Sequence, residues 1–186
     1  MFNNKDNCKN IVNELSNLVD LLDEKQTEEL YKQITSAKAI YLAAAGRSKL
    51  MLQAFGMRLM HIGFNVHVVG DVTTPAITDQ DLLLIASGSG ETASLVSMAN
   101  KAKKVGAKLA LVSTKNSSSI ASLADCVVVI PTSTPKVEGS KPLSIQPGAS
   151  LFEQTLLIYF DSFILTYMSD NNIDLSTVMV KHANLE

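Results

Sequence analysis

The 186-residue sequence predicts a doubly wound α/β fold, in which helices flank a five-stranded parallel sheet. Two observations carry this prediction. Short, continuously apolar runs recur along the chain, as is typical of strands buried on both faces of a parallel sheet. Segments with helical periodicity lie between most of these runs, and this alternation is typical of doubly wound sheets. An N-terminal helical hairpin is expected before the first strand.

The hairpin is indicated by apolar residues at helical spacing, which stop at a short polar break and then resume. They are Ile11, Leu15, Leu18, Leu22, Leu30 and Ile34. The first helix is expected to begin at Asn10. We expect one domain over residues 1–186, with N-terminal helices at 1–38, an α/β sandwich at 39–170 and a C-terminal tail at 171–186.

The remaining elements follow in order along the chain. Strands are expected at residues 39–45, 66–69, 82–86, 109–112 and 127–130. One helix is expected after the first strand, with an apolar face formed by Leu52, Phe55, Leu59 and Ile62. Further helices are expected over residues 92–105, 119–124 and 149–169, and a final turn over residues 174–182. Gly63 and Gly106 are placed to end two of these helices. Pro75 argues against a long helix in residues 70–80, and residues 131–147, with four of the five prolines, predict one long surface loop.

Composition excludes several classes of function. The net charge is −2 and the basic residues are scattered, so no surface for nucleic acid is expected. The N-terminus lacks the apolar core of a secretory signal, and Glu153, Gln154 and Asp161 interrupt the most apolar predicted helix, so we expect no membrane insertion. Cys8 and Cys126 lie outside any metal-binding spacing and favour a reducing cytoplasm.

The expected ligand site lies where the strand order reverses, at the carboxyl ends of the strands. In the flavodoxin-like order 2-1-3-4-5 this switch point falls between the first and third strands. The segments that follow these two strands are residues 46–48 and 87–92. The second segment holds two glycines, two serines and a threonine before a helix N-terminus. Backbone N–H groups and hydroxyls in such a loop can hold a phosphate. An ordinary strand-to-helix turn explains the same residues equally well.

A dinucleotide site is the main competing interpretation of this loop. Gly88, Gly90 and Ala93 match the loose pattern Gly-x-Gly-x-x-Gly/Ala. That pattern also requires an acid about 20 residues further on, to bind the ribose. Residues 92–124 contain neither Asp nor Glu, and Lys115 could suit only a 2′-phosphate. A nucleotide-binding oxidoreductase is therefore the less favoured interpretation.

Several segments of the chain resemble the sugar isomerase (SIS) domain family. They are Gly46-Arg47-Ser48, residues 57–64 and residues 87–92. Residues 146–154, which read Gln-Pro-Gly-Ala-Ser-Leu-Phe-Glu-Gln, and the closing residues 182–186, which read His-Ala-Asn-Leu-Glu, more narrowly resemble the 6-phospho-3-hexuloisomerase family. The resemblance extends from about Asn10 to the last residue and implies a SIS-type fold.

The resemblance implies a ketose-phosphate isomerase that interconverts D-arabino-hex-3-ulose 6-phosphate and D-fructose 6-phosphate through an enediolate, in the ribulose monophosphate pathway of formaldehyde fixation. It further implies a cytoplasmic homotetramer without metal or other cofactor, coupled in function to a hexulose-phosphate synthase. The implied substrate-binding residues are Ser48, Ser87, Gly88, Ser89, Gly90, Glu91 and Thr92, and Arg47 is a further candidate from its position at the switch point. The implied catalytic residues are Glu153, as proton acceptor, and His182, as proton shuttle.

Glu153 has two interpretations. A desolvated carboxylate can remove a proton from the carbon beside a carbonyl, as isomerisation through an enediolate requires. However, Ser150-x-x-Glu153 ahead of an apolar helix is also a capping box, which the residues by themselves favour. The resemblance favours the base.

Other charged residues also keep two interpretations. Glu91 is a second carboxylate beside the phosphate loop, or a complement to the helix dipole. Arg47 attracts an anionic substrate, or it is a solvated loop charge. His61 is a substrate contact or a partly buried residue at a helix end. His182 lies in a tail that is otherwise expected to be disordered, and acts in the site of its own or a neighbouring subunit.

Two alternatives stand beside the ketose isomerase. One is a non-catalytic SIS module that binds phosphosugars, and the other is a different aldose–ketose phosphate isomerase. Whichever holds, we expect the chain to self-associate. Its apolar helices offer more apolar surface than a five-stranded sheet in one subunit can cover.

Overall fold

The computed structural model describes residues 3–132 and 144–185, and its centre is a five-stranded parallel sheet. The strands are β1 (Ile40–Ala44), β2 (Val66–Val68), β3 (Leu82–Ala86), β4 (Lys108–Ser113) and β5 (Cys126–Val129). Their order is β2-β1-β3-β4-β5. The predicted order is confirmed, and with it the switch point between β1 and β3.

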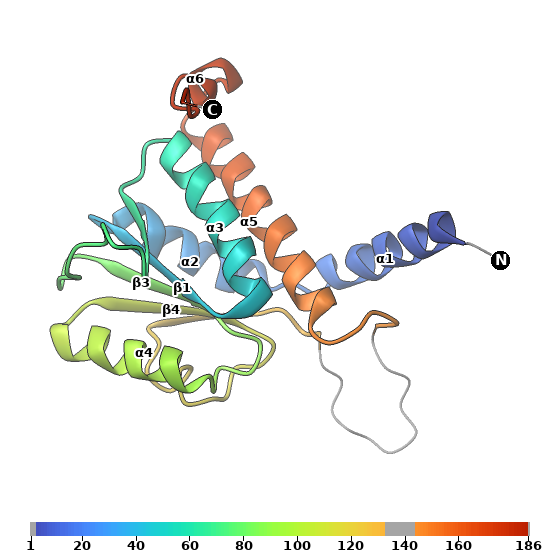
Figure 1. Ribbon diagram of the computed structural model, residues 1–186, viewed down its shortest axis with the longest axis horizontal. Helices are drawn as coiled ribbons and strands as arrows, with labels where there is room; N and C mark the ends of the chain where they lie inside the picture. Colours follow the sequence, from blue (N-terminus) through green and yellow to red (C-terminus); the bar gives the residue numbers. More distant parts are fainter. Residues whose placement is uncertain (1–2, 133–143, 186) are drawn as a thin grey trace.

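Helices cover both faces of the sheet (Figure 1). In the described residues they are α1 (Asn4–Val19), α2 (Glu24–Ser36), α3 (Gly46–His61), α4 (Ala93–Val105), α5 (Ser150–Asp170) and α6 (Leu175–Met179). Helices α2, α3 and α5 share a core with one face, and α4 packs on the other. Helix α1 extends away from the body of the molecule, and α6 lies at the far end of α3 and α5 (Figure 1).

The core forms as two layers because successive strand residues point to opposite faces. Ile40 and Leu42 of β1 pack towards α3 and α5, whereas Tyr41 and Ala43 pack towards α4. On the first face, Phe55 of α3 stacks on a phenylalanine of α5, Phe160, with 4.2 Å between ring centroids. This packing holds α3 and α5 side by side.

The structure corrects several predicted boundaries. Helix α1 begins at Asn4 rather than Asn10. Residues 46–48 form the first turn of α3 and not a loop, because Gly46, at φ +57°, turns the chain from β1 directly into the helix. Residues 119–124 form turns instead of a helix, and their backbone hydrogen bonds mix three-residue and four-residue spacings instead of repeating the α-helical one.

Other expectations agree with the structure. Gly63 and Gly106 follow α3 and α4 at φ +104° and +92°, the left-handed conformation that ends helices. No helix lies between β2 and β3. Most of the predicted loop at 131–147 lies outside the described residues, and α6 occupies the middle of the predicted final turn. Within the described chain, none of the helices has the length and apolarity that a membrane span needs.

Candidate phosphosugar site

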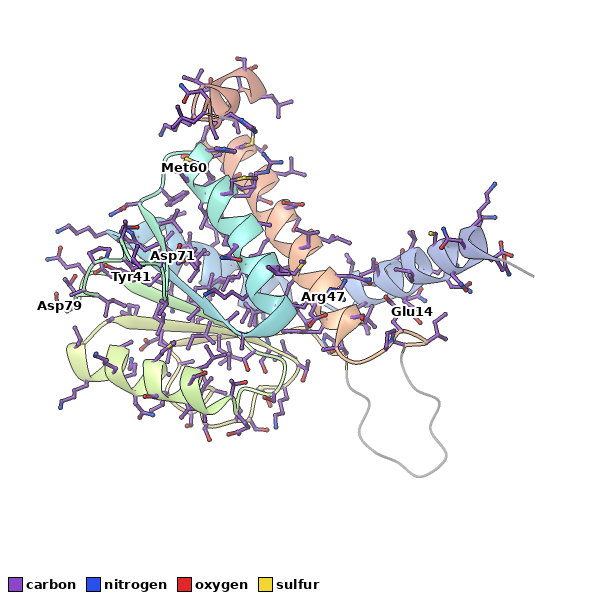
Figure 2. The ribbon with its side chains drawn as sticks, in the orientation of Figure 1. Glu14, Tyr41, Arg47, Met60, Asp71 and Asp79 are labelled. Atoms are coloured by element: carbon purple, nitrogen blue, oxygen red, sulfur yellow. The ribbon has the colours of Figure 1, made fainter. Side chains whose placement is uncertain are left out.

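The two segments selected from the sequence converge on one edge of the sheet. Ala44 at the end of β1 pairs with Ala86 at the end of β3, so the chain leaves both strands side by side. The first segment enters α3, and the second forms the loop at 87–92 before α4. Helix α5 begins at the same edge, where Arg47 lies (Figure 2). The first turn of α3, the loop and the start of α5 thus surround one site.

The loop at 87–92 is shaped from within by Ser87 and Gly90. The hydroxyl of Ser87, which is only 5% exposed, accepts a hydrogen bond from the Gly90 N–H at 3.1 Å. Gly90 has a φ of +65°, and a Cβ at this position would overlap the side chain of Ser118. Gly90 is therefore required by conformation and by space. Ser87 shapes the loop and does not line its cavity.

The end of β4 fixes the outer part of the loop. The hydroxyls of Ser113 and Thr114 both donate to the Gly88 carbonyl, at 3.1 and 2.7 Å. The amide N–H groups of Gly88 and Ser89 have no acceptor within the described parts of the chain. Two donors of a rigid loop are therefore directed outward, as anion binding requires.

A cavity of about 440 Å³ opens at this loop, a volume within the usual range of small-molecule sites. It is lined by Gly88, Ser89, Thr114, Lys115, Thr132, Gly148, Ala149 and Phe152. The sequence pointed to Gly88 and Ser89, but Thr114, Lys115 and Phe152 were missed as site residues. The loop after β4 could have been found by the rule that carboxyl ends of neighbouring parallel strands share an edge.

Glu91 and Thr92 lie where the loop joins α4. The Glu91 carboxylate accepts a hydrogen bond from the Ser119 N–H at 2.9 Å, and hydrogen bonds from Ser119 hold the pKa of Glu91 below its usual value. This carboxylate thus fixes the turn at 119–124, and it does not line the cavity. Thr92 is the N-cap of α4, yet its hydroxyl makes no capping bond.

Arg47 and Glu153 form an ion pair between the first turns of α3 and α5. The Arg47 guanidinium donates through Nη1 to Glu153 Oε2 at 2.9 Å and to the Ser150 hydroxyl at 3.1 Å. Glu153 is 13% exposed. It lies one residue after Phe152, which lines the cavity. Ser48, in the same turn of α3 as Arg47, is 8% exposed.

The capping-box interpretation of Glu153 is wrong. The N-cap of α5 is Ala149, which makes no side-chain capping bond. The Ser150 hydroxyl instead donates to the Pro147 carbonyl at 2.7 Å, and Glu153 turns to Arg47. Glu153 is therefore bonded to Arg47 of α3, and not to a backbone N–H at the start of its own helix.

His61 and His182 lie at the other end of α3. His61 is 3% exposed and its ring stacks on that of His182, with 5.4 Å between centroids. Burial, together with Arg58 and His182, lowers the pKa of His61. Ser48 and His61 are about 20 Å apart at the helical rise of about 1.5 Å per residue. Within one chain, the structure therefore does not bring His182 to Glu153.

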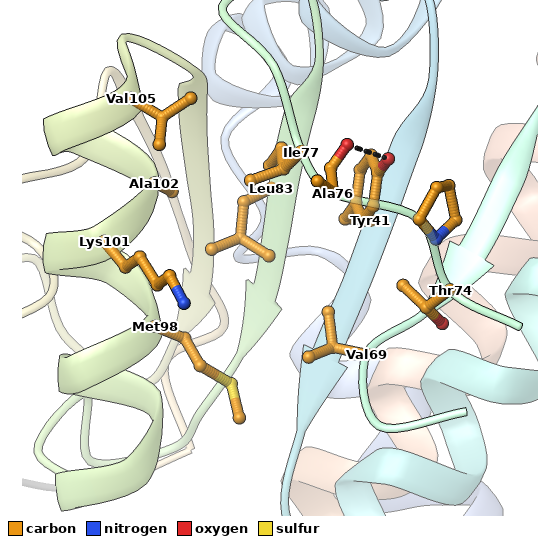
Figure 3. A pocket seen from close by; sticks show the side chains of 11 residues that line it. Tyr41, Val69, Thr74, Ala76, Ile77, Leu83, Met98, Lys101, Ala102 and Val105 are labelled. Atoms are coloured by element: carbon orange, nitrogen blue, oxygen red, sulfur yellow. Dashed lines mark hydrogen bonds between the residues drawn. The ribbon is translucent and has the colours of Figure 1, made fainter. Parts of the chain in front are cut away.

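A second cavity, of about 310 Å³, lies on the α4 side of the sheet (Figure 3). Its wall includes Tyr41, Val69, Leu83 and Met98, and the Tyr41 hydroxyl donates to the Ala76 carbonyl at 3.1 Å. Lys101 is the charged side chain among its lining residues. Because this wall is almost wholly apolar, it offers little to a phosphate. No group of three or more His, Cys, Asp or Glu side chains gathers as a metal site in the described chain.

Fold and site together define a doubly wound α/β protein with a cavity at the carboxyl ends of β3 and β4, and with an Arg47–Glu153 ion pair at the start of α5. The chain belongs to the SIS domain family, whose model matches residues 33–159. It is 43% identical over 176 residues to a 3-hexulose-6-phosphate isomerase of Bacillus subtilis, with 95% of each chain covered. It is 41% identical over 180 residues to the enzyme of the same name from Mycobacterium gastri, covering 97% of this chain and 90% of the other.

A solved structure has the same fold. It is that of a Methanococcus jannaschii protein, for which a molecular function of 3-hexulose-6-phosphate isomerase was inferred. Its TM-score is 0.83 at 31% sequence identity, and the match covers 97% of this chain and 99% of that one. The similarity therefore extends over sequence and fold together.

Proposed function

We propose that this chain is a ketose-phosphate isomerase that interconverts D-arabino-hex-3-ulose 6-phosphate and D-fructose 6-phosphate. One observation carries the proposal: the Glu153 carboxylate, held by Arg47, lies in the first turn of α5, the same turn that brings Phe152 to the wall of the cavity with Gly88, Ser89 and Lys115. A phosphosugar isomerase needs this combination of an anion site and a proton acceptor. Similarity over nearly the whole length to relatives named 3-hexulose-6-phosphate isomerase supports the same substrate.

The phosphate would bind at the loop. The Gly88 and Ser89 N–H groups, the Ser89 and Thr92 hydroxyls and the N-terminus of α4 provide donors, and Lys115 on the same cavity provides a positive charge. Phe152 forms an apolar wall. Binding energy at the phosphate would hold the sugar carbons in a fixed position relative to α5.

Glu153 would act as the base. It removes the proton from C2 of the 3-ketose, and the electron pair forms the C2–C3 double bond of an enediolate whose charge lies on the C3 oxygen. Return of a proton to C3, with proton transfer from the C2 hydroxyl to the C3 oxygen, gives the 2-ketose. The Arg47 ion pair uses Oε2, and we assign Oε1 to the transfer at carbon.

The transfer between the two oxygens would fall to His182 of a second copy of the chain. In its own chain His182 stacks on His61, at the far end of α3. In a site built between two subunits, His182 of one copy would reach Glu153 of the other. A homotetramer in the cytoplasm, working with a hexulose-phosphate synthase on the product of formaldehyde fixation, is part of the proposal.

A coupled assay tests the function. Ribulose 5-phosphate, formaldehyde and a hexulose-phosphate synthase supply the substrate, and formation of fructose 6-phosphate is followed with and without the purified chain. We expect turnover that depends on the chain and is lost in Glu153→Gln. Binding of fructose 6-phosphate without any turnover would support the non-catalytic SIS module instead.

A further inference from the structure

Helix α1 contacts the segment that leads into α5 through one carboxylate. Glu14 accepts three hydrogen bonds from the segment at 144–146, although α1 otherwise extends away from the body (Figure 1). The Ile145 N–H donates to Oε1 at 2.7 Å, and Oε2 accepts from the Ser144 hydroxyl at 2.8 Å and the Gln146 side-chain amide at 2.9 Å. Both oxygens of Glu14 are therefore used.

These bonds are of the strong, charge-assisted kind. Burial raises the pKa of Glu14, but the hydrogen bonds from Gln146, Ile145 and Ser144 outweigh it, so the pKa lies below its usual value. The carboxylate is thus ionised at neutral pH, and hydrogen bonds to a charged acceptor are stronger than neutral ones. The Ser144 hydroxyl also accepts from the Gln146 N–H at 3.0 Å, which closes the cluster.

A line of contacts leads from this cluster to the site. After Gln146 come Pro147, whose carbonyl accepts from Ser150, and Gly148, which has a φ of +60° and lines the cavity. The Ser150 hydroxyl accepts from Arg47, which in turn holds Glu153. Glu14 and Arg47 lie near the two sides of the start of α5 (Figure 2).

We propose that Glu14 is a positioning residue of the isomerase: by clamping residues 144–146 it holds the turn into α5, and so fixes where Ala149 and Phe152 line the cavity and where Glu153 meets Arg47. The inference rests on the proposed function. It also gives a role to Gln146, the first residue of the motif at 146–154.

Three variants test the clamp. Glu14→Ala removes all three hydrogen bonds, and because a shift of about 1 Å in a reacting group can cost about a hundredfold, we expect kcat to fall at least about tenfold. The Kd of fructose 6-phosphate should stay within about threefold, since the loop at 87–92 is untouched. Glu14→Gln should keep kcat within about threefold, because glutamine can accept from Ile145 and donate to Ser144 and a turned Gln146 amide. Asp6→Asn, on the exposed first turn of α1, is the matched control.

Amide hydrogen exchange provides a second measurement that does not depend on activity. In Glu14→Ala, exchange at residues 148–153 should quicken at least about tenfold, while β3 stays as protected as in the parent chain. Unchanged exchange there, or parental kcat in Glu14→Ala, would overturn the inference. Should Glu14→Ala fail to fold, Gln146→Ala, which removes one of the three bonds, is expected to give a smaller loss of the same kind, and no loss would count against the clamp. If the parent chain lacks isomerase activity, the proposed function fails, and the exchange rates still decide whether Glu14 holds the turn.

Discussion

Arg47 of α3 and Glu153 of α5 meet at 2.9 Å, although 106 residues separate them in the sequence. The pair joins the end of β1 to the start of α5 at the switch point of the sheet. Because Arg47 also donates to Ser150, one guanidinium orients the first turn of α5 and its carboxylate together. The site therefore depends on the packing of two helices, which Phe55 and Phe160 hold side by side.

Glu153→Gln tests the base. Glutamine keeps the hydrogen bond to Arg47 but cannot accept a proton from carbon. We expect kcat to fall at least about a hundredfold, the low end of what a positioned base contributes, with an unchanged melting temperature. The mutant should also stop exchange of substrate hydrogen with deuterated water. Glu28→Gln, which removes an exposed carboxylate paired with Lys32, is the control. Near-parental exchange and turnover in Glu153→Gln would exclude Glu153 as the base.

Ser89→Ala tests the phosphate loop. The substitution removes a hydroxyl donor from the cavity wall and leaves the backbone N–H groups in place. A hydrogen bond to a charged group is worth about 1.5 to 3 kcal/mol, so the KM should rise about tenfold to a hundredfold with little effect on folding. Calorimetry with fructose 6-phosphate measures the loss. Equal binding by the mutant and the parent chain would show that the phosphate lies elsewhere.

Gly90→Ala tests the shape of the loop. A Cβ at φ +65° is strained and would overlap Ser118, so the free energy of unfolding should fall by about 1 to 3 kcal/mol or more. Gly148→Ala is the matched control, because its φ is +60° but a Cβ there would meet no atom within 4 Å. Urea unfolding measures both, and we expect the larger loss in Gly90→Ala. Equal losses would mean that the Ser118 contact contributes nothing.

The buried histidine predicts a pH dependence of stability. The pKa of His61 lies below its usual 6.5, so the unfolded chain binds a proton at a higher pH than the folded chain. Its contribution to the free energy of unfolding is therefore complete above about pH 6.5 and is lost as the pH falls through the folded pKa. Urea midpoints at about pH 7.5 and 5.5 should differ less in His61→Phe than in the parent chain. If both lose the same stability over this interval, His61 is not the group responsible.

Self-association is predicted from exposed apolar side chains on α3 and α5. Met57, Ile158 and Leu165 are 45%, 42% and 65% exposed. Light scattering should give a mass well above the 20.0 kDa of one chain, and Leu165→Glu should lower it. Turnover should fall with the mass, because His182 of a second copy completes the proposed site. A parent chain that is monomeric at micromolar concentration would refute both the assembly and this role of His182.

Candidate site residues could be predicted where the signal is local. Gly88 and Ser89 were identified because they follow a buried strand at the switch point, a position that the order of apolar runs reveals. Lys115 and Phe152 were not identified, because the strand-end rule was applied only to the two strands that flank the switch point, whereas Lys115 follows β4 and Phe152 lies in a helix. The turns at 119–124 were taken for a helix, since local composition does not show whether a short segment repeats the four-residue hydrogen-bond spacing of an α-helix.

The sequence by itself determined the sheet of this protein, because strands buried on both faces must be continuously apolar and glycine must stand where the chain turns at positive φ. Only the tertiary structure decided the partners of three carboxylates, Glu14, Glu91 and Glu153. Glu91 takes an N–H that is 28 residues away, Glu153 a guanidinium 106 residues away and Glu14 an N–H 131 residues away. Local patterns reach only three or four residues along a helix, so the capping box at Glu153 was visible in the sequence while Arg47, its actual partner, was not.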